Sequence, residues 1–333
     1  MAYDPHVLRR ATELLEQQRR EHQLKKAHLR LQAYDRQPRL EQLDRQLQGT
    51  MAQLVATTLR KGGNAAEAVR NIKDRNLAIQ AERAELLAEL GLSPEALDDS
   101  PMCSNCGDTG WKGAKMCPCL KSIYAAEQIG ELSKLLDLGS QSFETFRLDY
   151  YPDQILPGDS KSPRSRMTTV RDICKAYADN FGSFAIRNLF LHGAPGLGKT
   201  FLSACIARAV SEQGHSVVYD TAGNIFAQFE DRKFQRGGDN QEARDETRRY
   251  LSCDLLIVDD LGSELTTQFT QTALYELVNT RLVGEKQTVI SSNLSMEEAA
   301  RRYSPQIASR LEGEYHVLHF FGDDIRLLKK NRL

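Results

Sequence analysis

The chain has 333 residues, of which 41% are hydrophobic and 27% are charged, and its formal net charge is −1. This balance excludes a globally basic chain, so any contact with nucleic acid must come from a local patch. No apolar run approaches the length of a membrane span, and the amino terminus does not have the pattern of a signal peptide. A chain this long needs no disulfide framework, so we expect a cytoplasmic protein. Its length predicts about two domains.

Residues 1–100 are polar and rich in Leu, Gln, Glu, Arg and Ala, which predicts a helical amino-terminal region. Pro38 separates a first helix from a second, Gly62 and Gly63 end the second, and a third stops at Gly91. Residues 1–60 hold eleven Lys and Arg against seven Asp and Glu, an excess of positive charge that is too mild for a DNA-binding arm. We therefore expect a solvated helical bundle or a partner-binding appendage.

Four cysteines in two close pairs mark the next segment, residues 101–135. They are Cys103, Cys106, Cys117 and Cys119, in the spacing C-x₂-C-x₁₀-C-x-C, with a Gly-rich stretch between the pairs. Four thiolates suit tetrahedral Zn²⁺ and leave no open position for a water, so the spacing predicts a structural zinc site. A redox dithiol pair and unrelated buried cysteines are the alternatives.

Residues 136–166 contain several prolines and glycines and are expected to be a linker. Its aromatics Phe143 and Phe146 either pack in the core or lie against an adenine ring. From residue 167 to 333, helical and strand patterns alternate, which is typical of an α/β fold with a parallel sheet. The expected strands are 188–192, 216–220, 254–259, 287–291 and 315–320.

A phosphate-binding loop follows the first of these strands. It reads Gly193-Ala194-Pro195-Gly196-Leu197-Gly198-Lys199-Thr200 and fits G-x-x-x-x-G-K-[ST]. Apolar residues at helical spacing come directly after it. Glycines let consecutive N–H groups point at phosphate oxygens, and the helix amino terminus adds positive potential. We expect Lys199 to neutralise the β- and γ-phosphates of ATP and the Thr200 hydroxyl to bind Mg²⁺.

Two later strands end in polar residues. The apolar run before Asp259 and Asp260 is the Walker B pattern, and acids at the carboxyl edge of a parallel sheet face the same crevice as the phosphate loop. We expect Asp259 to hold Mg²⁺ and Asp260 to deprotonate the attacking water. Asn293 ends the next strand and is expected to position that water or contact the γ-phosphate. The alternative for the two acids is a capping role in the following turn.

This ordered set of motifs, together with Ile307-Ala-Ser-Arg310-Leu, resembles the bacterial AAA+ helicase-loader ATPases of the DnaC/DnaI type, whose core the IstB transposition ATPases share. The resemblance covers roughly residues 140–333, and the cysteine cluster ahead of them looks more like the DnaI type. It implies a P-loop AAA+ core in which Asn293 is a sensor, Arg310 is an arginine finger acting on a neighbouring subunit and Arg326 is a further phosphate sensor.

The resemblance implies an ATP-dependent loader that delivers a hexameric replicative helicase onto single-stranded DNA, binds the helicase through its amino-terminal region and self-associates with ATP. The segment Phe226–Gly238 mixes aromatics with cations, a pattern that suits single-stranded DNA or else an amphipathic helix followed by a solvated loop. The alternatives for the whole chain are an IstB-like transposition regulator and a nucleotide-switched DNA-binding scaffold.

Overall fold

The computed structural model describes residues 3–59, 65–134, 136, 141–155, 157–234 and 241–330. The chain forms two compact units, one made of residues 1–12 and 118–333 and the other of residues 13–117. Gly62 and Gly63, where the sequence predicts a helix break, lie outside the described residues. Within the part of the chain that the structure describes, no helix combines the length and the apolar character needed to cross a membrane.

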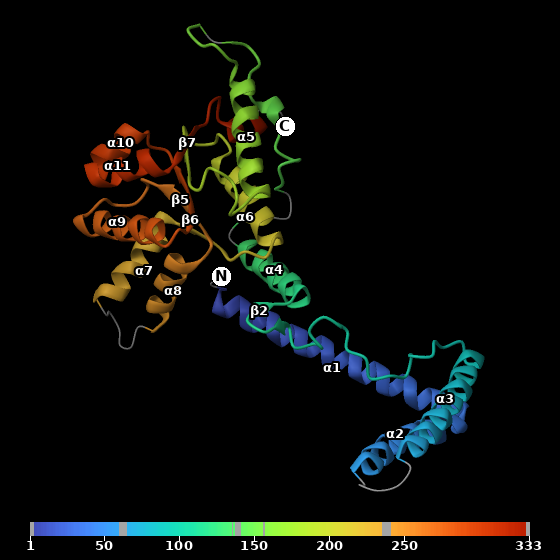
Figure 1. Cartoon of the computed structure of the whole chain (residues 1–333). Helices are drawn as coiled ribbons and strands as arrows, with labels where there is room; N and C mark the ends of the chain where they lie inside the picture. Colours follow the sequence, from blue (N-terminus) through green and yellow to red (C-terminus); the bar gives the residue numbers. More distant parts are fainter. Residues whose placement is uncertain are drawn as a thin grey trace. The chain divides into compact units, whose positions relative to one another are not determined.

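The larger unit, whose sheet and covering helices are drawn in Figure 1, is built on a five-stranded, all-parallel sheet. The strand order is β4-β5-β6-β3-β7. The strands are β3 (Leu189–His192), β4 (Val217–Thr221), β5 (Leu255–Leu261), β6 (Gln287–Ser292) and β7 (His316–His319). All five lie where the sequence predicts them, because a strand buried on both faces reads as a continuous apolar run. The predicted α/β fold class is confirmed.

Helices cover both faces of this sheet. They are α4 (Pro118–Leu132), α5 (Pro163–Asp179), α6 (Lys199–Glu212), α7 (Ala222–Phe234), α8 (Gln241–Ser252), α9 (Gln268–Val283), α10 (Met296–Arg302), α11 (Pro305–Glu314) and α12 (Ile325–Lys330). Successive strand residues point to opposite faces of the sheet. Leu189 and Ile257 pack with α5 and α6 on one face. Phe190 and Val258 pack with α7 to α11 on the other. A turn of 3₁₀ helix, η1 (Leu148–Tyr150), precedes α5.

The segment before α5 packs more closely than its composition suggests. Phe143, Phe146 and Tyr151 are buried in the core cluster that also contains α5 and α6. The Tyr151 hydroxyl donates a hydrogen bond of 2.9 Å to the Leu197 carbonyl oxygen in the phosphate loop. This part of the predicted linker therefore packs in the core beside the phosphate loop and forms a hydrogen bond with it.

The smaller unit is helical, as the sequence predicts. It contains most of α1 (Pro5–Arg36), with α2 (Pro38–Leu59), α3 (Ala65–Glu89) and a two-stranded hairpin of β1 (Trp111–Lys112) and β2 (Lys115–Met116). Leu40, Leu87 and Leu97 lie in its small apolar core. Beside it, the Arg83 guanidinium pairs with Asp44 at 2.6 Å and with Asp98 at 2.9 Å.

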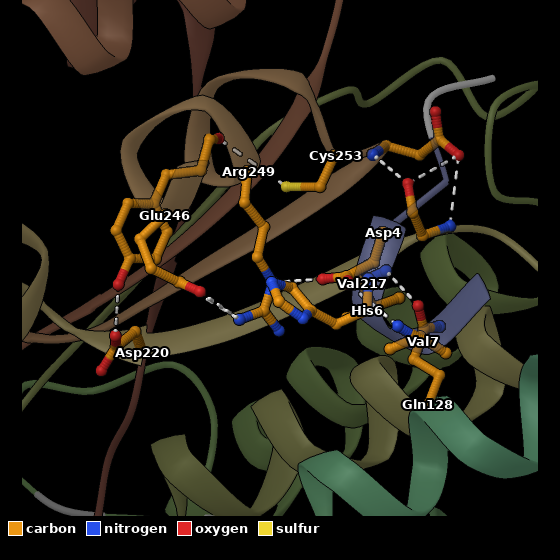
Figure 2. Close-up of polar contacts among 12 residues, drawn as sticks. Asp4, His6, Val7, Gln128, Val217, Asp220, Glu246, Arg249 and Cys253 are labelled. Carbon is orange, nitrogen blue, oxygen red and sulfur yellow. Dashed lines mark hydrogen bonds and ion pairs between the residues drawn. The ribbon is translucent and has the colours of Figure 1, made fainter. Parts of the chain in front are cut away.

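The first residues of the chain are anchored in the larger unit by Asp4 (Figure 2). The Asp4 carboxylate accepts hydrogen bonds from the backbone N–H groups of His6 (2.9 Å) and Val7 (3.1 Å), which caps α1. Its other oxygen pairs with Arg249 of α8, and its backbone N–H donates to the Tyr124 hydroxyl of α4 at 3.0 Å. The start of α1 thus joins α4 to α8.

Candidate nucleotide and metal sites

The phosphate loop connects β3 to α6 and is shaped by glycines with positive φ. At Gly196 φ is +77°, and a side chain there would meet the Asp324 carboxylate, whose nearest oxygen lies 2.0 Å from the position of a Cβ. At Gly193 φ is +147°, and the carbonyl oxygen of Phe320 leaves only 2.7 Å. The residues after β7 therefore pack directly on the loop, and only glycine fits at these two positions.

Lys199 lies at the start of α6 with its ammonium group folded into the loop. Nζ donates to the carbonyl oxygens of Gly193 (2.7 Å) and Ala194 (2.8 Å) and to Asn293 Oδ1 (2.9 Å). Burial lowers the pKa of Lys199, while the charges of Asp259 and Asp260 act in the opposite direction. An anion bound here would stabilise the charged form of Lys199.

The two acids at the end of β5 also face the phosphate loop, although β6 separates β5 from β3, the strand that leads into this loop. The Thr200 hydroxyl lies 3.2 Å from Asp259 Oδ2, so a hydroxyl and a carboxylate are positioned together, as a Mg²⁺ site requires. Asp260 Oδ1 accepts from Asn293 Nδ2 at 3.0 Å. Because Asn293 also accepts from Lys199, it connects the phosphate loop to the Walker B acids.

These groups line one cavity of about 630 Å³, large enough for a nucleotide. Its lining includes, from the sequence prediction, Pro195, Gly196, Leu197, Gly198, Lys199, Thr200, Asp259, Asp260, Asn293 and Arg326. The structure thus brings together both Walker motifs, Asn293 and Arg326 in one crevice at the carboxyl edge of the sheet. Gly193 and Ala194 contribute through their carbonyl contacts with Lys199.

Arg310 does not line this cavity. It lies on α11, and its guanidinium carbon is 5.5 Å from the ring centroid of Tyr275 on α9. Arg326, on α12, is exposed and its charge contributes to lowering the pKa of Lys199. The two arginines therefore differ in position: Arg326 lines the cavity, and Arg310 does not.

Several lining residues were missed by sequence reasoning. Arg147, Tyr150 and Lys329 line the cavity, and both cations lie against the Tyr150 ring, at 4.9 Å and 5.8 Å from its centroid. Phe146 also lines the cavity but packs on Tyr151 and Phe201 in the core. No local motif marks these positions, because they come together only through the packing of η1 and α12 on the phosphate loop.

Of the two interpretations of the segment that begins at Phe226, the structure agrees with the amphipathic helix, because Phe226 and Phe229 are core residues. Phe226 and Phe229 are 3% and 2% exposed and pack in the core beneath α7. Arg232 pairs with Glu276 of α9 at 2.7 Å. The alternation of aromatics and cations here reflects the two faces of an amphipathic helix. The end of the segment, residues 235–238, lies outside the described residues.

The four cysteines of the predicted zinc site converge. The sulfurs of Cys103, Cys106, Cys117 and Cys119 all lie within 4.8 Å of one another. Cys103 Sγ and Cys117 Sγ are 3.7 Å apart, close to the roughly 3.8 Å edge of a tetrahedron with Zn–S bonds of about 2.3 Å. The donor set therefore fits Zn²⁺.

Neighbouring groups hold this arrangement. The Asp108 carboxylate, at a residue with φ of +63°, accepts from the backbone N–H groups of Met102 (3.0 Å) and Cys103 (2.8 Å). The Asn105 amide nitrogen lies 3.4 Å from Cys117 Sγ, within reach of an N–H···S bond. Such outer contacts orient metal ligands.

Comparison with known proteins links the part of the chain that contains the phosphate loop to an ATP-binding family. Residues 181–332 match the family described as IstB-like ATP binding protein. The chromosomal replication initiator protein DnaA of Aquifex aeolicus is 30% identical over 142 residues, which is 43% of this chain and 34% of that protein. This chain therefore aligns with only about a third of that relative's length.

Two solved structures are also similar to this chain. The crystal structure of the DnaC helicase loader matches with a TM-score of 0.42 and 18% identity, over 54% of this chain and 98% of that one. The crystal structure of DnaI matches with a TM-score of 0.42 and 18% identity, over 56% and 92%. Through residues 181–332, which include the phosphate loop and both acids of β5, this chain is thus similar to the IstB-like ATP-binding proteins.

Proposed function

We propose that this chain is an ATP-dependent loader that delivers a ring-shaped replicative helicase onto single-stranded DNA when replication begins, and that it works in the cytoplasm. The observation that carries the proposal is the single cavity that joins both Walker motifs through Asn293, in a chain that also has a helical unit and a four-cysteine centre. The sequence similarity to a replication initiator supports the same process.

The residues of the cavity account for ATP hydrolysis. Lys199 and Arg326 bind phosphate oxygens, and Thr200 and Asp259 hold Mg²⁺, which neutralises phosphate charge when bound. Asp260, oriented by Asn293, accepts a proton from the attacking water. The water oxygen then bonds to the γ-phosphorus as the bond to the β–γ bridging oxygen breaks. An entering phosphate replaces the loop carbonyls as partners of the Lys199 ammonium.

Arg310 has the role of a finger that acts on a neighbouring subunit. Since it lies outside the cavity of its own chain, we expect Arg310→Ala to bind ATP normally and to lose hydrolysis about 10³-fold or more. Mixing Arg310→Ala with Lys199→Ala should give more activity than the two variants measured separately, because some interfaces then pair an intact loop with an intact arginine. Co-assembly is verified by size-exclusion chromatography. Co-assembly without any gain would place the action of Arg310 within its own subunit.

A second candidate function is regulation of a transposase, which the IstB-like family match favours. The two functions share the ATPase chemistry and differ in the protein that the chain binds. In both functions the helical unit and the four-cysteine centre would bind the partner protein, because none of their described residues lines the nucleotide cavity. A nucleotide-switched DNA scaffold without turnover is the third possibility, and steady-state turnover with saturating DNA separates it from the first two.

The decisive experiment is capture of the hexameric replicative helicase of the same organism by the full-length chain. We expect the wild type and Lys199→Ala to retain the helicase on a column, since the nucleotide site is not the docking surface. The double variant Cys103→Ser/Cys117→Ser should lose it. Retention of the co-encoded transposase in place of the helicase would replace the loader proposal by the transposition one.

A further inference from the structure

We propose that Ser291 is the positioning residue that lets two consecutive acids, Asp259 and Asp260, serve the same nucleotide site; the inference rests on the proposed ATPase function. Ser291 lies on β6 beside the Walker B strand and is 1% exposed. Its hydroxyl donates to Asp259 Oδ1 and accepts from the backbone N–H of Asp260 at 3.1 Å. One hydroxyl therefore contacts both acids.

The need for such a residue follows from strand geometry. Successive side chains of a regular strand point to opposite faces of the sheet, so adjacent acids would be separated. Here both Asp259 and Asp260 line the nucleotide cavity. The backbone of β5 must therefore depart from the regular pattern between them.

The pairing of β5 with β6 shows this departure. Val258 pairs with Ile290 and Leu261 pairs with Ser292, so that two residues of β5 lie opposite the single residue Ser291. This is a β-bulge, a feature that redirects side chains and is frequent next to active sites. Asp260 takes the strained conformation of the bulge, with φ of +55°.

The hydrogen bonds of Ser291 stabilise this bulge at its centre. A hydroxyl has one proton, so donation to Asp259 leaves its lone pairs to receive the Asp260 N–H, which the bulge removes from the strand ladder. On the other side, the Tyr219 hydroxyl of β4 donates to Asp259 Oδ2. The Asp259 carboxylate is thus held from both neighbouring strands, and the Asp260 backbone is held by Ser291.

The test compares Ser291→Ala with Ser292→Ala. Ser292 is the matched control, because it is equally buried on the same strand and also makes two hydrogen bonds, to the Leu261 carbonyl oxygen (2.6 Å) and from the Leu294 N–H (3.0 Å), but it contacts neither acid. Turnover, the Mg²⁺ concentration that half-saturates nucleotide binding, nucleotide affinity without Mg²⁺, and thermal stability are measured for both variants.

We expect Ser291→Ala to lower kcat and to raise the half-saturating Mg²⁺ concentration, each by about 10- to 100-fold, as for other residues that orient metal ligands. Nucleotide affinity without Mg²⁺ should stay unchanged, since the phosphate loop is intact. Ser291→Thr should restore both properties, because it keeps the hydroxyl. Ser292→Ala should lose stability to a similar degree while keeping the Mg²⁺ dependence of the wild type.

Wild-type kcat and Mg²⁺ dependence in Ser291→Ala, or equal losses in Ser292→Ala, would overturn the proposal. Tyr219→Phe adds an independent check: it removes one bond to Asp259 and none to Asp260, so the Mg²⁺ requirement should rise with a smaller loss of kcat. If the wild-type chain hydrolyses no ATP, the proposed ATPase function fails, and the Mg²⁺ titration of nucleotide binding still decides the role of Ser291.

Discussion

Lys199→Ala is expected to lose most nucleotide binding, whereas Asp260→Asn is expected to bind normally and to hydrolyse poorly. The Lys199 ammonium is buried in the phosphate loop, and we expect it to contact phosphate in the ground state. Charge-assisted hydrogen bonds of this kind contribute about 1.5–3 kcal/mol, which corresponds to roughly a 10- to 150-fold loss of affinity. Fluorescent-nucleotide titration measures it, with the exposed Lys175→Ala as the control.

Asp260 is expected to act later, in the transition state of hydrolysis. Its replacement by asparagine keeps the side-chain shape but removes the base, so affinity should stay within about 2-fold while kcat falls by about 10²- to 10⁴-fold. The pair of variants separates ground-state binding from transition-state stabilisation. Normal turnover in Asp260→Asn would remove Asp260 from the role of base, and unchanged affinity in Lys199→Ala would remove the phosphate loop from nucleotide binding.

The second large effect is expected at the cysteine cluster. Purified protein should contain one zinc per chain, and Cys103→Ser/Cys117→Ser should contain none, because two thiolates are too few to close a tetrahedral site. Structural zinc contributes about 10–16 kcal/mol to the folding of small zinc modules at neutral pH. Hydrogen exchange should therefore rise sharply over residues 101–117 in this variant. Metal content is measured by inductively coupled plasma mass spectrometry.

Cys205→Ala is the matched control, since Cys205 is a buried thiol of α6 outside the cluster. It should keep the full zinc content. ATP binding should persist in the double variant, because none of the four cysteines lines the nucleotide cavity. Stoichiometric zinc in Cys103→Ser/Cys117→Ser would show that the metal is held elsewhere.

Those features of the site that depend on local chemistry could be predicted from the sequence. The phosphate loop is one continuous stretch in which glycines set the backbone and Lys199 follows at a fixed distance, so its letters are enough to recognise it. The five strands are recognisable because burial on both faces requires apolar runs. The two cysteine pairs are close in sequence, so their convergence follows from short connections.

Other features were decided only by the tertiary structure, because they join residues that no local pattern links. A serine two residues before Asn293 is unremarkable in the sequence, and it gains a role only when β6 lies against the bulge of β5. Asp324 reaches Gly196 only because β7 lies beside β3. Phe226 and Phe229 have the composition of a binding surface, but their helix turns them into the core.

The anchoring of Asp4 is the extreme case. The first residues of a polar helical segment carry no sequence signal for the ATP-binding unit, yet Asp4 pairs with Arg249, 245 positions later in the chain. An ion pair of this kind depends on the approach of two helices, and such approaches are set by the packing of their apolar faces. The sequence thus determined the phosphate loop, the two acids of β5 and the four-cysteine cluster, and tertiary packing determined which residues hold them in position.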